Sequence, residues 1–397
     1  MRPSSRLASC YRRAGWAEMQ EASPWKRAAR IAPFLVGAWS VAAFLAAGVS
    51  GLAWTTPPAP DEVALTQGGL VLRSAIAGAL IGSASAWLET AVLPGFARRL
   101  PLAAALTIRT LAYAAVVVAV VFAVMFSTAF VLADLSPGEL VADPRFSEFL
   151  ETGTLLRFVT VLIAASFVIN LALQLRRVLG PATLRALALG TYRRPREEDR
   201  VFLFLDLTDS TAIAERLGPL RFTDFKNDFF ADVAEPVLAT GGRIVQYVGD
   251  EVMVSWPMAP ALKSGAPLRF FALVEARISG RAERYRHRYG IVPAFKAGCH
   301  GGPVVTAEVG DLKRDIVHSG DVVNTAARIE AECRPRGERL LLSAALAAAM
   351  PVPEGLTIRE LGEVSLRGKA EAVAICAVRP ARLGENAEEA TGADLVA

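Results

Sequence analysis

The stretch VFLFLDLTDST, residues 201–211, decides the fold expected for the second half of this 397-residue chain. Its apolar run predicts a buried strand, and this strand ends in Asp206, a carboxylate that is rarely buried without a partner. A second stretch, RIVQYVGDEVMVSW at 243–256, places Asp250 in a Gly-Asp turn between two strand-like segments. Two carboxylates brought together beside free backbone N–H groups form a site for divalent metal and polyphosphate. The two aspartates therefore indicate nucleotide chemistry.

Outward from these aspartates, hydrophobic patterning predicts an α/β domain over residues 200–379. The expected elements are, in chain order, a strand at 201–205, helices at 212–217 and 222–239, hairpin strands at 243–247 and 251–256, a helix at 267–289, strands at 293–300 and 303–309, and a helix from Asp321. Strand, helix, two hairpin strands, helix and strand is the βαββαβ order of a ferredoxin-like core. A segment of roughly 180 residues is long enough to bury a core of its own.

The first half of the chain is too apolar for an ordinary soluble protein. The whole chain is 53% hydrophobic and 21% charged, with a mean hydropathy of +0.37, and the apolar excess lies in the first half. Four segments reach the ~20 residues that a helix needs to cross a bilayer core, at 31–54, 69–88, 104–133 and 155–175. They predict an α-helical, four-span membrane domain over residues 31–178. We expect Arg109, near the end of the third span, to extend its side chain to the bilayer interface.

The distribution of basic residues predicts the orientation in the membrane. Lysines and arginines gather in the N-terminal segment 1–30, between the second and third spans, and after the fourth span, whereas the other two loops are acidic. By the positive-inside rule, both termini and the α/β domain lie in the cytoplasm, as in a multi-pass protein of the cell inner membrane. A linker at 179–199 contains a short predicted helix; coupling of the two halves and a solvated spacer are equally good interpretations of it. The tail at 380–397 is expected to be disordered.

Composition also argues against several functions. The four cysteines form no CxxC pattern, so neither a disulfide framework nor a zinc site is expected. The net charge of +4 is explained by the basic membrane flanks, and nucleic acid is not expected as a partner. A transporter would need polar residues along several spans, and these are scarce.

Four separated motifs resemble one enzyme family. The motifs are LFLDLTDST, YVGDEVMVSW, GCHGGPVVTAEVG and HSGDVVNTAARIE, in this order. Together they resemble the class III nucleotidyl cyclase catalytic domain, whose members convert ATP or GTP into the 3′,5′-cyclic monophosphate and pyrophosphate. The resemblance implies a cyclase with two Mg²⁺ or Mn²⁺ ions per site, and the predicted spans would make it a membrane-anchored cyclase of the bacterial type. It also implies a homodimer, because the family takes the metal-binding aspartates from one subunit and an Asn/Arg pair from the other.

The resemblance assigns roles to individual residues. Asp206 and Asp250 are the expected metal ligands, with the backbone carbonyl of Leu207 as a further one. The amides of the turn that follows would bind the β- and γ-phosphates at a helix N-terminus; this turn comprises Thr208, Asp209, Ser210 and Thr211. Asn324 would orient the ribose, and Arg328, four residues later on the same helix face, would stabilise charge on the α-phosphate.

Basic residues further along supply candidates for the remaining phosphate contacts. The SLRGK segment offers Arg367 or Lys369, of which Lys369 is favoured. Lys313 and Arg314 are additional candidates, and a solvated turn is an equally good interpretation of them.

The base-selecting positions depart from the family pattern. Gln246 stands four residues before Asp250, where adenylate cyclases usually have lysine, and Val317 stands seven before Asn324, where aspartate or threonine is usual. A glutamine amide can both donate to and accept from adenine, which favours ATP. The same amide turned over can serve guanine, so a guanylate cyclase stays open. A catalytically weak, cyclase-like membrane receptor is the other alternative.

Overall fold

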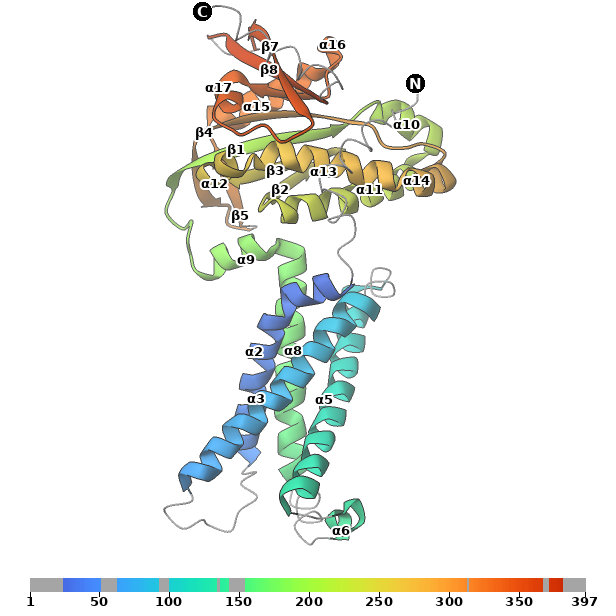
Figure 1. Cartoon of the computed structure of the whole chain (residues 1–397), viewed down its shortest axis with the longest axis vertical. Helices are drawn as coiled ribbons and strands as arrows, with labels where there is room; N and C mark the ends of the chain where they lie inside the picture. Colours follow the sequence, from blue (N-terminus) through green and yellow to red (C-terminus); the bar gives the residue numbers. More distant parts are fainter. Residues whose placement is uncertain are drawn as a thin grey trace, which may run out of the picture. The chain divides into compact units, whose positions relative to one another are not determined.

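The structure is a computed structural model that describes residues 24–50, 63–92, 100–133, 136–142, 154–312, 314–366 and 371–380. It divides into two compact units, Glu21–Leu184 and a second unit that contains Arg185–Ala397 (Figure 1). Residues 1–23 of the predicted basic segment and 381–397 of the predicted tail lie outside the described residues, whereas 24–30 form the start of the first helix.

The first unit is built from long helices, as the apolar segments predict. They are α2 (Pro24–Ser50), α3 (Val63–Trp87) with the π-helical turn η2 (Leu88–Val92), α5 (Leu102–Ala133), the short α6 (Pro137–Ala142) and α8 (Thr154–Leu179). Each predicted apolar segment overlaps one of the four long helices, with residues 51–54 of the first segment outside the described residues. Two stretches in the described residues are long and apolar enough to cross a membrane, Ser74–Val92 and Ala103–Val124, and the apolar stretches Ile31–Leu45 and Thr160–Arg176 are shorter.

Small residues allow α2 and α3 to pack backbone against backbone. Gly78 and Gly82 form a GxxxG pattern on α3, and a Cβ atom added to either would lie 2.3 Å from the Cα of Ser40 or 2.5 Å from that of Val36. This close approach is typical of helix pairs in membranes, where small residues replace the hydrophobic driving force.

Several polar side chains of this unit are buried inside it. Arg109 of α5 forms an ion pair with Glu89 of η2 at 3.3 Å, and their side chains are 2% and 1% exposed. The expectation that Arg109 extends to an interface is therefore wrong, because Glu89 neutralises it in the interior. Large apolar side chains lie on the surface instead, among them Leu72, Leu111, Leu156 and Val168.

The second unit contains one mixed sheet with helices on both faces. Its elements up to the fourth strand are β1 (Arg196–Leu207), α10 (Ser210–Leu217), α11 (Pro219–Ala239), β2 (Arg243–Val248), β3 (Glu251–Pro257), α12 (Met258–Ser264), α13 (Ala266–Gly280), α14 (Ala282–Tyr289) and β4 (Phe295–Val309). The remaining ones are β5 (Asp315–Ser319), α15 (Asp321–Ala331), α16 (Cys333–Arg336), β6 (Leu340–Ser343), α17 (Ala344–Ala348), β7 (Leu356–Val364) and β8 (Val373–Pro380).

The strand order confirms the predicted core. The sheet runs β2-β3-β1-β4-β6-β8-β7, and β5 pairs with β4. Within it, β2-β3-β1-β4 is antiparallel throughout, which is the arrangement that a βαββαβ sequence adopts in a ferredoxin-like core. The short strand β6 then pairs parallel to β4 and extends the sheet.

Three sequence-based boundaries are corrected. The helix predicted at 267–289 is two helices, because Gly280 ends α13 and Arg281 has non-helical backbone angles. The strands predicted at 293–300 and 303–309 are the single strand β4, which pairs along the whole of β1 through the Gly301-Gly302-Pro303 segment. Strand β1 begins at Arg196, inside the segment predicted as a linker, and the strands β5, β6, β7 and β8 were not predicted.

The two faces of β1 have different partners, because successive side chains of a strand point to opposite faces. Odd-numbered side chains from Val201 to Leu207 pack into the core formed with α11 and α13. Phe202 and Phe204 pack with Val322 and other residues of α15 on the opposite face. Asp206 continues this second series and so lies on the α15 face.

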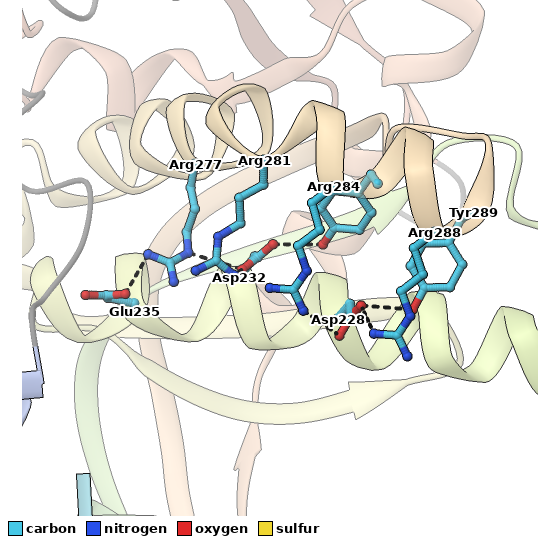
Figure 2. A network of polar contacts seen from close by, with 9 residues as sticks. Asp228, Asp232, Glu235, Arg277, Arg281, Arg284, Arg288 and Tyr289 are labelled. Atoms are coloured by element: carbon cyan, nitrogen blue, oxygen red, sulfur yellow. Dashed lines mark hydrogen bonds and ion pairs between the residues drawn. The ribbon is translucent and has the colours of Figure 1, made fainter. Parts of the chain in front are cut away.

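A ladder of ion pairs joins α11 to α13 and α14 (Figure 2). The carboxylate of Asp232 accepts hydrogen bonds from Arg277, Arg281 and the Tyr285 hydroxyl, although its side chain is only 2% exposed. One turn away, Asp228 accepts hydrogen bonds from Arg288 and the Tyr289 hydroxyl, and Arg284 forms a longer ion pair with it. The ladder fixes the helix layer behind the sheet across the break between α13 and α14.

The start of the second unit is attached to the sheet. Helix α9 (Pro181–Ala188) is followed by a turn in which Gly190 has a positive φ of 62°. The backbone carbonyl of Tyr192 then accepts a hydrogen bond from the Glu308 amide of β4 at 2.8 Å. The segment just before β1 is thus held against β4.

Candidate active site

Asp206 lies in a row of charged residues that crosses three strands. In the register of the sheet it stands opposite Glu251 of β3 on one side and Lys296 of β4 on the other. The Lys296 ammonium contacts its carboxylate at 2.6 Å. Burial raises the pKa of Asp206 above its ordinary value and the nearby Asp250 adds to this, whereas Lys296 opposes it.

Asp250 reaches this row from the β2–β3 turn. Gly249 has a positive φ of 64°, which glycine adopts without strain and which allows the tight turn. The Gly249 carbonyl accepts a hydrogen bond from Lys226 of α11 at 3.2 Å, so the turn is anchored to the helix layer. The fold therefore brings the two predicted metal ligands together.

Three charged residues at this site were not predicted from the sequence. Lys296 binds both Asp206 and Glu330 of α15, and Glu251 stands beside them. Burial raises the pKa of Glu251 to about 7, and the negative charges of Glu330 and Asp206 contribute. For Lys296, burial lowers the pKa, but the hydrogen bonds to Asp206 and Glu330 outweigh it and raise the pKa.

The donor set fits divalent ions that are shared with a nucleotide. In the described parts of the chain, no three His, Cys, Asp or Glu side chains form a cluster that could hold a metal ion alone. Asp206 and Asp250 provide two hard oxygen ligands, which is how Mg²⁺ is usually held when phosphates and water complete its shell. The nearby negative charge of Asp250 contributes to the raised pKa of Asp206. A bound cation would offset the repulsion between the two carboxylates.

The turn after β1 leads into the N-terminus of α10. Asp209 has a φ of 55°, the one positive value at a non-glycine residue in the described segments, and its side chain forms no cap hydrogen bond. The first amides of α10, at Ser210 and Thr211, lie at the positive end of the helix dipole. The Thr208 amide donates to the Ala294 carbonyl at 2.8 Å, so it is not among the free groups that were predicted.

Helix α15 carries the other predicted catalytic pair. Asn324 is exposed in its first turn, and Arg328 is half-buried one turn later. The Nη1 atom of Arg328 is buried and has no hydrogen-bond partner in the described residues. Glu332, the neighbour that offered a purely structural role, pairs instead with Arg336 at 3.1 Å. A buried guanidinium nitrogen without a partner is costly, which favours a role with a bound anion.

The base-selecting candidates lie on two separate strands, Gln246 on β2 at the sheet edge and Val317 on β5, which pairs with β4. Gln246 and Val317 are both exposed. Val245, next to Gln246, packs on the apolar cluster that contains Phe202. The ring of His318, next to Val317, lies 5.3 Å from the Phe202 ring. No contact between Gln246 and Val317 is present in the described parts of the chain.

Of the basic residues that were predicted as further phosphate ligands, the structure describes only Arg314. Arg367, Lys369 and Lys313 lie outside the described residues. Arg314 pairs with Glu308 of β4 at 3.0 Å, so its guanidinium is partly occupied by a neighbour on the same hairpin.

The second unit thus has an antiparallel ferredoxin-like core, with Asp206 at the end of β1, Asp250 in the β2–β3 turn, and Asn324 and Arg328 on α15. Residues 194–376 match the family model described as "Adenylate and Guanylate cyclase catalytic domain". This part of the chain belongs to that family.

Individual relatives agree with the family. The chain is 38% identical over 231 residues to "Adenylate cyclase 2" of Rhizobium meliloti (strain 1021), covering 58% of this chain and 64% of that protein. It is 29% identical over 199 residues to "Guanylate cyclase 2D" of Rattus norvegicus, covering 49% of this chain and 18% of the relative. A solved structure of a bacterial light-regulated adenylyl cyclase aligns with a TM-score of 0.47 and 19% identity, covering 62% of this chain and 70% of the other. The chain thus spans less than two thirds of the curated relatives' length.

Proposed function

We propose that the chain is a membrane-anchored nucleotidyl cyclase that converts ATP into 3′,5′-cyclic AMP and pyrophosphate for signal transduction. The observation that carries this proposal is the acidic pair Asp206 and Asp250 beside the N-terminus of α10. The buried, unpartnered Arg328 nitrogen on α15 supports it independently.

Ring closure requires metal binding, phosphate binding and stabilisation of charge on the α-phosphate, and a different group of residues supplies each. Two Mg²⁺ or Mn²⁺ ions held by Asp206, Asp250 and the Leu207 carbonyl would lower the pKa of the ribose 3′-hydroxyl and neutralise the leaving pyrophosphate. The amides of Ser210 and Thr211 bind the terminal phosphates. Arg328 stabilises the negative charge that develops on the α-phosphate, a contact whose loss typically costs ~100-fold in rate.

ATP is the proposed substrate because of Gln246. The exposed amide offers a donor and an acceptor in the pattern that reads adenine. The similarity to an adenylate cyclase at 38% identity supports this choice. The similarity to a guanylate cyclase keeps GTP as the second candidate.

A homodimer is proposed because each chain carries both half-sites but does not join them. Asn324 is exposed, and among the described residues it has no contact with Asp206 or Asp250. A second copy would bring its own Asn324 and Arg328 to the metal-binding aspartates, giving two equivalent sites.

A bilayer is the proposed environment of the first unit. Its surface is apolar, its charged pair is in the interior, and α2 and α3 pack through a GxxxG pattern. Apolar groups outside and polar groups inside are favourable in lipid and unfavourable in water. We therefore propose four spans in the inner membrane, with both termini and the catalytic unit in the cytoplasm.

One assay tests the function. Purified full-length protein with Mn²⁺ and either ATP or GTP should release cyclic AMP from ATP, and the Asp250→Asn variant should lose the activity at least 100-fold. Formation of cyclic GMP from GTP, without cyclic AMP from ATP, would show that GTP is the substrate in place of ATP. If the wild-type protein forms neither cyclic AMP nor cyclic GMP, the proposed enzyme activity is refuted and the cyclase-like receptor is left.

A further inference from the structure

Lys296 is the centre of a charge network that connects the sheet to α15. It stands directly opposite Asp206 in the β1–β4 register, where side chains of neighbouring strands lie about 5 Å apart on the same face. Its ammonium contacts the carboxylates of both Asp206 and Glu330. The side chains of Lys296 and Glu330 are 16% and 9% exposed, so solvent screens these contacts little.

The position of Glu330 is set by backbone packing. Gly298, two residues after Lys296 on the same face of β4, has no side chain, and a Cβ atom added to it would lie 2.1 Å from the Glu330 amide nitrogen. Helix α15 therefore rests directly on β4 at this residue. The backbone of Glu330 is thereby held beside the strand that carries Lys296.

The charges of the network are not balanced. Four carboxylates, those of Asp206, Asp250, Glu251 and Glu330, face one ammonium group. Lys296 is the cation that contacts Asp206, and a divalent ion bound to the same carboxylate competes with it. Glu330 gives Lys296 a second partner, which allows the ammonium to stay in the network when a metal ion takes Asp206.

We propose that Lys296 is a positioning residue that holds Asp206 in place for the metal ion and ties it, through Glu330, to the helix that carries Asn324 and Arg328. This inference rests on the proposed function. Glu330 follows Arg328 by two residues on α15, so the network fixes the distance between the metal-binding strand and the phosphate-binding helix of one chain.

The proposal separates metal affinity from turnover. Lys296→Met removes the competing cation, so Mn²⁺ should bind on the order of tenfold more tightly to the full-length protein without nucleotide. Turnover should nevertheless fall by tenfold or more, because Asp206 and α15 lose their connection. Glu330→Gln leaves Lys296 with Asp206 alone, so Mn²⁺ should bind on the order of tenfold more weakly. Lys296→Arg keeps the charge and should restore both properties towards wild type.

Mn²⁺ binding is measured from the free-ion signal in electron paramagnetic resonance, and turnover from cyclic product, on full-length protein whose folding is checked by thermal unfolding. Arg336→Met is the matched control, because Arg336 pairs with Glu332 just beyond α15 and away from this network; it should change neither property. Mn²⁺ affinities within twofold of wild type in both Lys296→Met and Glu330→Gln would overturn the proposal, as would wild-type turnover in Lys296→Met. Asp206→Asn distinguishes a failure of this proposal from a failure of the proposed function. Wild-type Mn²⁺ binding in that variant would refute the metal site itself and with it the proposed function.

Discussion

Replacing Gly298 by alanine should move α15 away from the sheet. The added methyl group would lie 2.1 Å from the Glu330 nitrogen and 2.4 Å from its Cα, and both are backbone atoms. Ordinary contact begins near 3.4 Å, so the helix has to shift by more than 1 Å. Overpacking of this kind costs about 1–3 kcal/mol, and a clash with backbone atoms places the expected cost at the upper end. For a unit of this size, about 3 kcal/mol corresponds to roughly 6–12 °C in Tm.

Differential scanning calorimetry of the full-length protein measures this shift. Gly301→Ala is the matched control on the same strand, because its new Cβ would meet only side-chain carbons of Leu346, Met258 and Val201, at 3.2–3.3 Å. We expect Gly301→Ala to lower Tm by no more than about 4 °C. A Gly298→Ala protein that melts within 2 °C of this control would show that α15 does not rest on β4 as described.

Three further predictions concern other parts of the same unit. Asp232→Asn leaves the arginines of the ladder in Figure 2 without their buried carboxylate and should cost about 3 kcal/mol in urea unfolding, whereas the exposed Asp224→Asn should change stability by less than about 0.5 kcal/mol. The raised pKa of Glu251, about 7, means that its contribution to stability is present below pH 4.5 and is lost as the pH rises through 7. In EDTA, Glu251→Gln should therefore raise Tm by about 2–4 °C at pH 8, which allows for partial solvent screening, and leave it unchanged at pH 4.5; an equal effect at both pH values would contradict this assignment. Burial raises the pKa of the Cys299 thiol, so iodoacetamide at pH 8 should label it in urea and not in the native protein, as mass spectrometry can measure.

The parts of the site that sequence reasoning found are those set by local patterns. Alternation along 201–207 puts Asp206 at a strand end, and a Gly-Asp turn puts Asp250 at a hairpin tip, so two short-range rules were sufficient. The helical repeat predicts only that Asn324 and Arg328 share one helix face; their selection came from the resemblance to the cyclase family.

Lys296 and Glu330 could not be found in this way, because their proximity depends on strand register and helix packing. A single lysine at a strand start is normally a solvated residue. The available signal was the alternation in FKAGCHG, in which Lys296, Gly298 and His300 share the face opposite to Phe295 and Ala297, and a glycine inside a strand often marks a close backbone approach.

Dependence on packing between distant elements also explains why β4 was predicted as two strands. Gly301, Gly302 and Pro303 are typical turn residues, and they predicted a break between two strands. In the structure they continue β4, because Gly302 lies beneath Val322 of α15 and Pro303 pairs opposite Asp199 near the start of β1. Helix packing across the sheet thus outweighed the local preference.

The Lys296 connection has a consequence for the assembly as a whole. In the proposed homodimer, the metal-binding aspartates of a chain serve one active site and its α15 serves the other. An ion that changes the Lys296 contacts at the first site therefore acts on the helix that completes the second. Linkage is reciprocal, so occupancy of each site would alter affinity at the other. The two sites would then bind Mn²⁺ cooperatively. This coupling would give a Hill coefficient different from one for Mn²⁺ binding, and Lys296→Met should restore the coefficient to one.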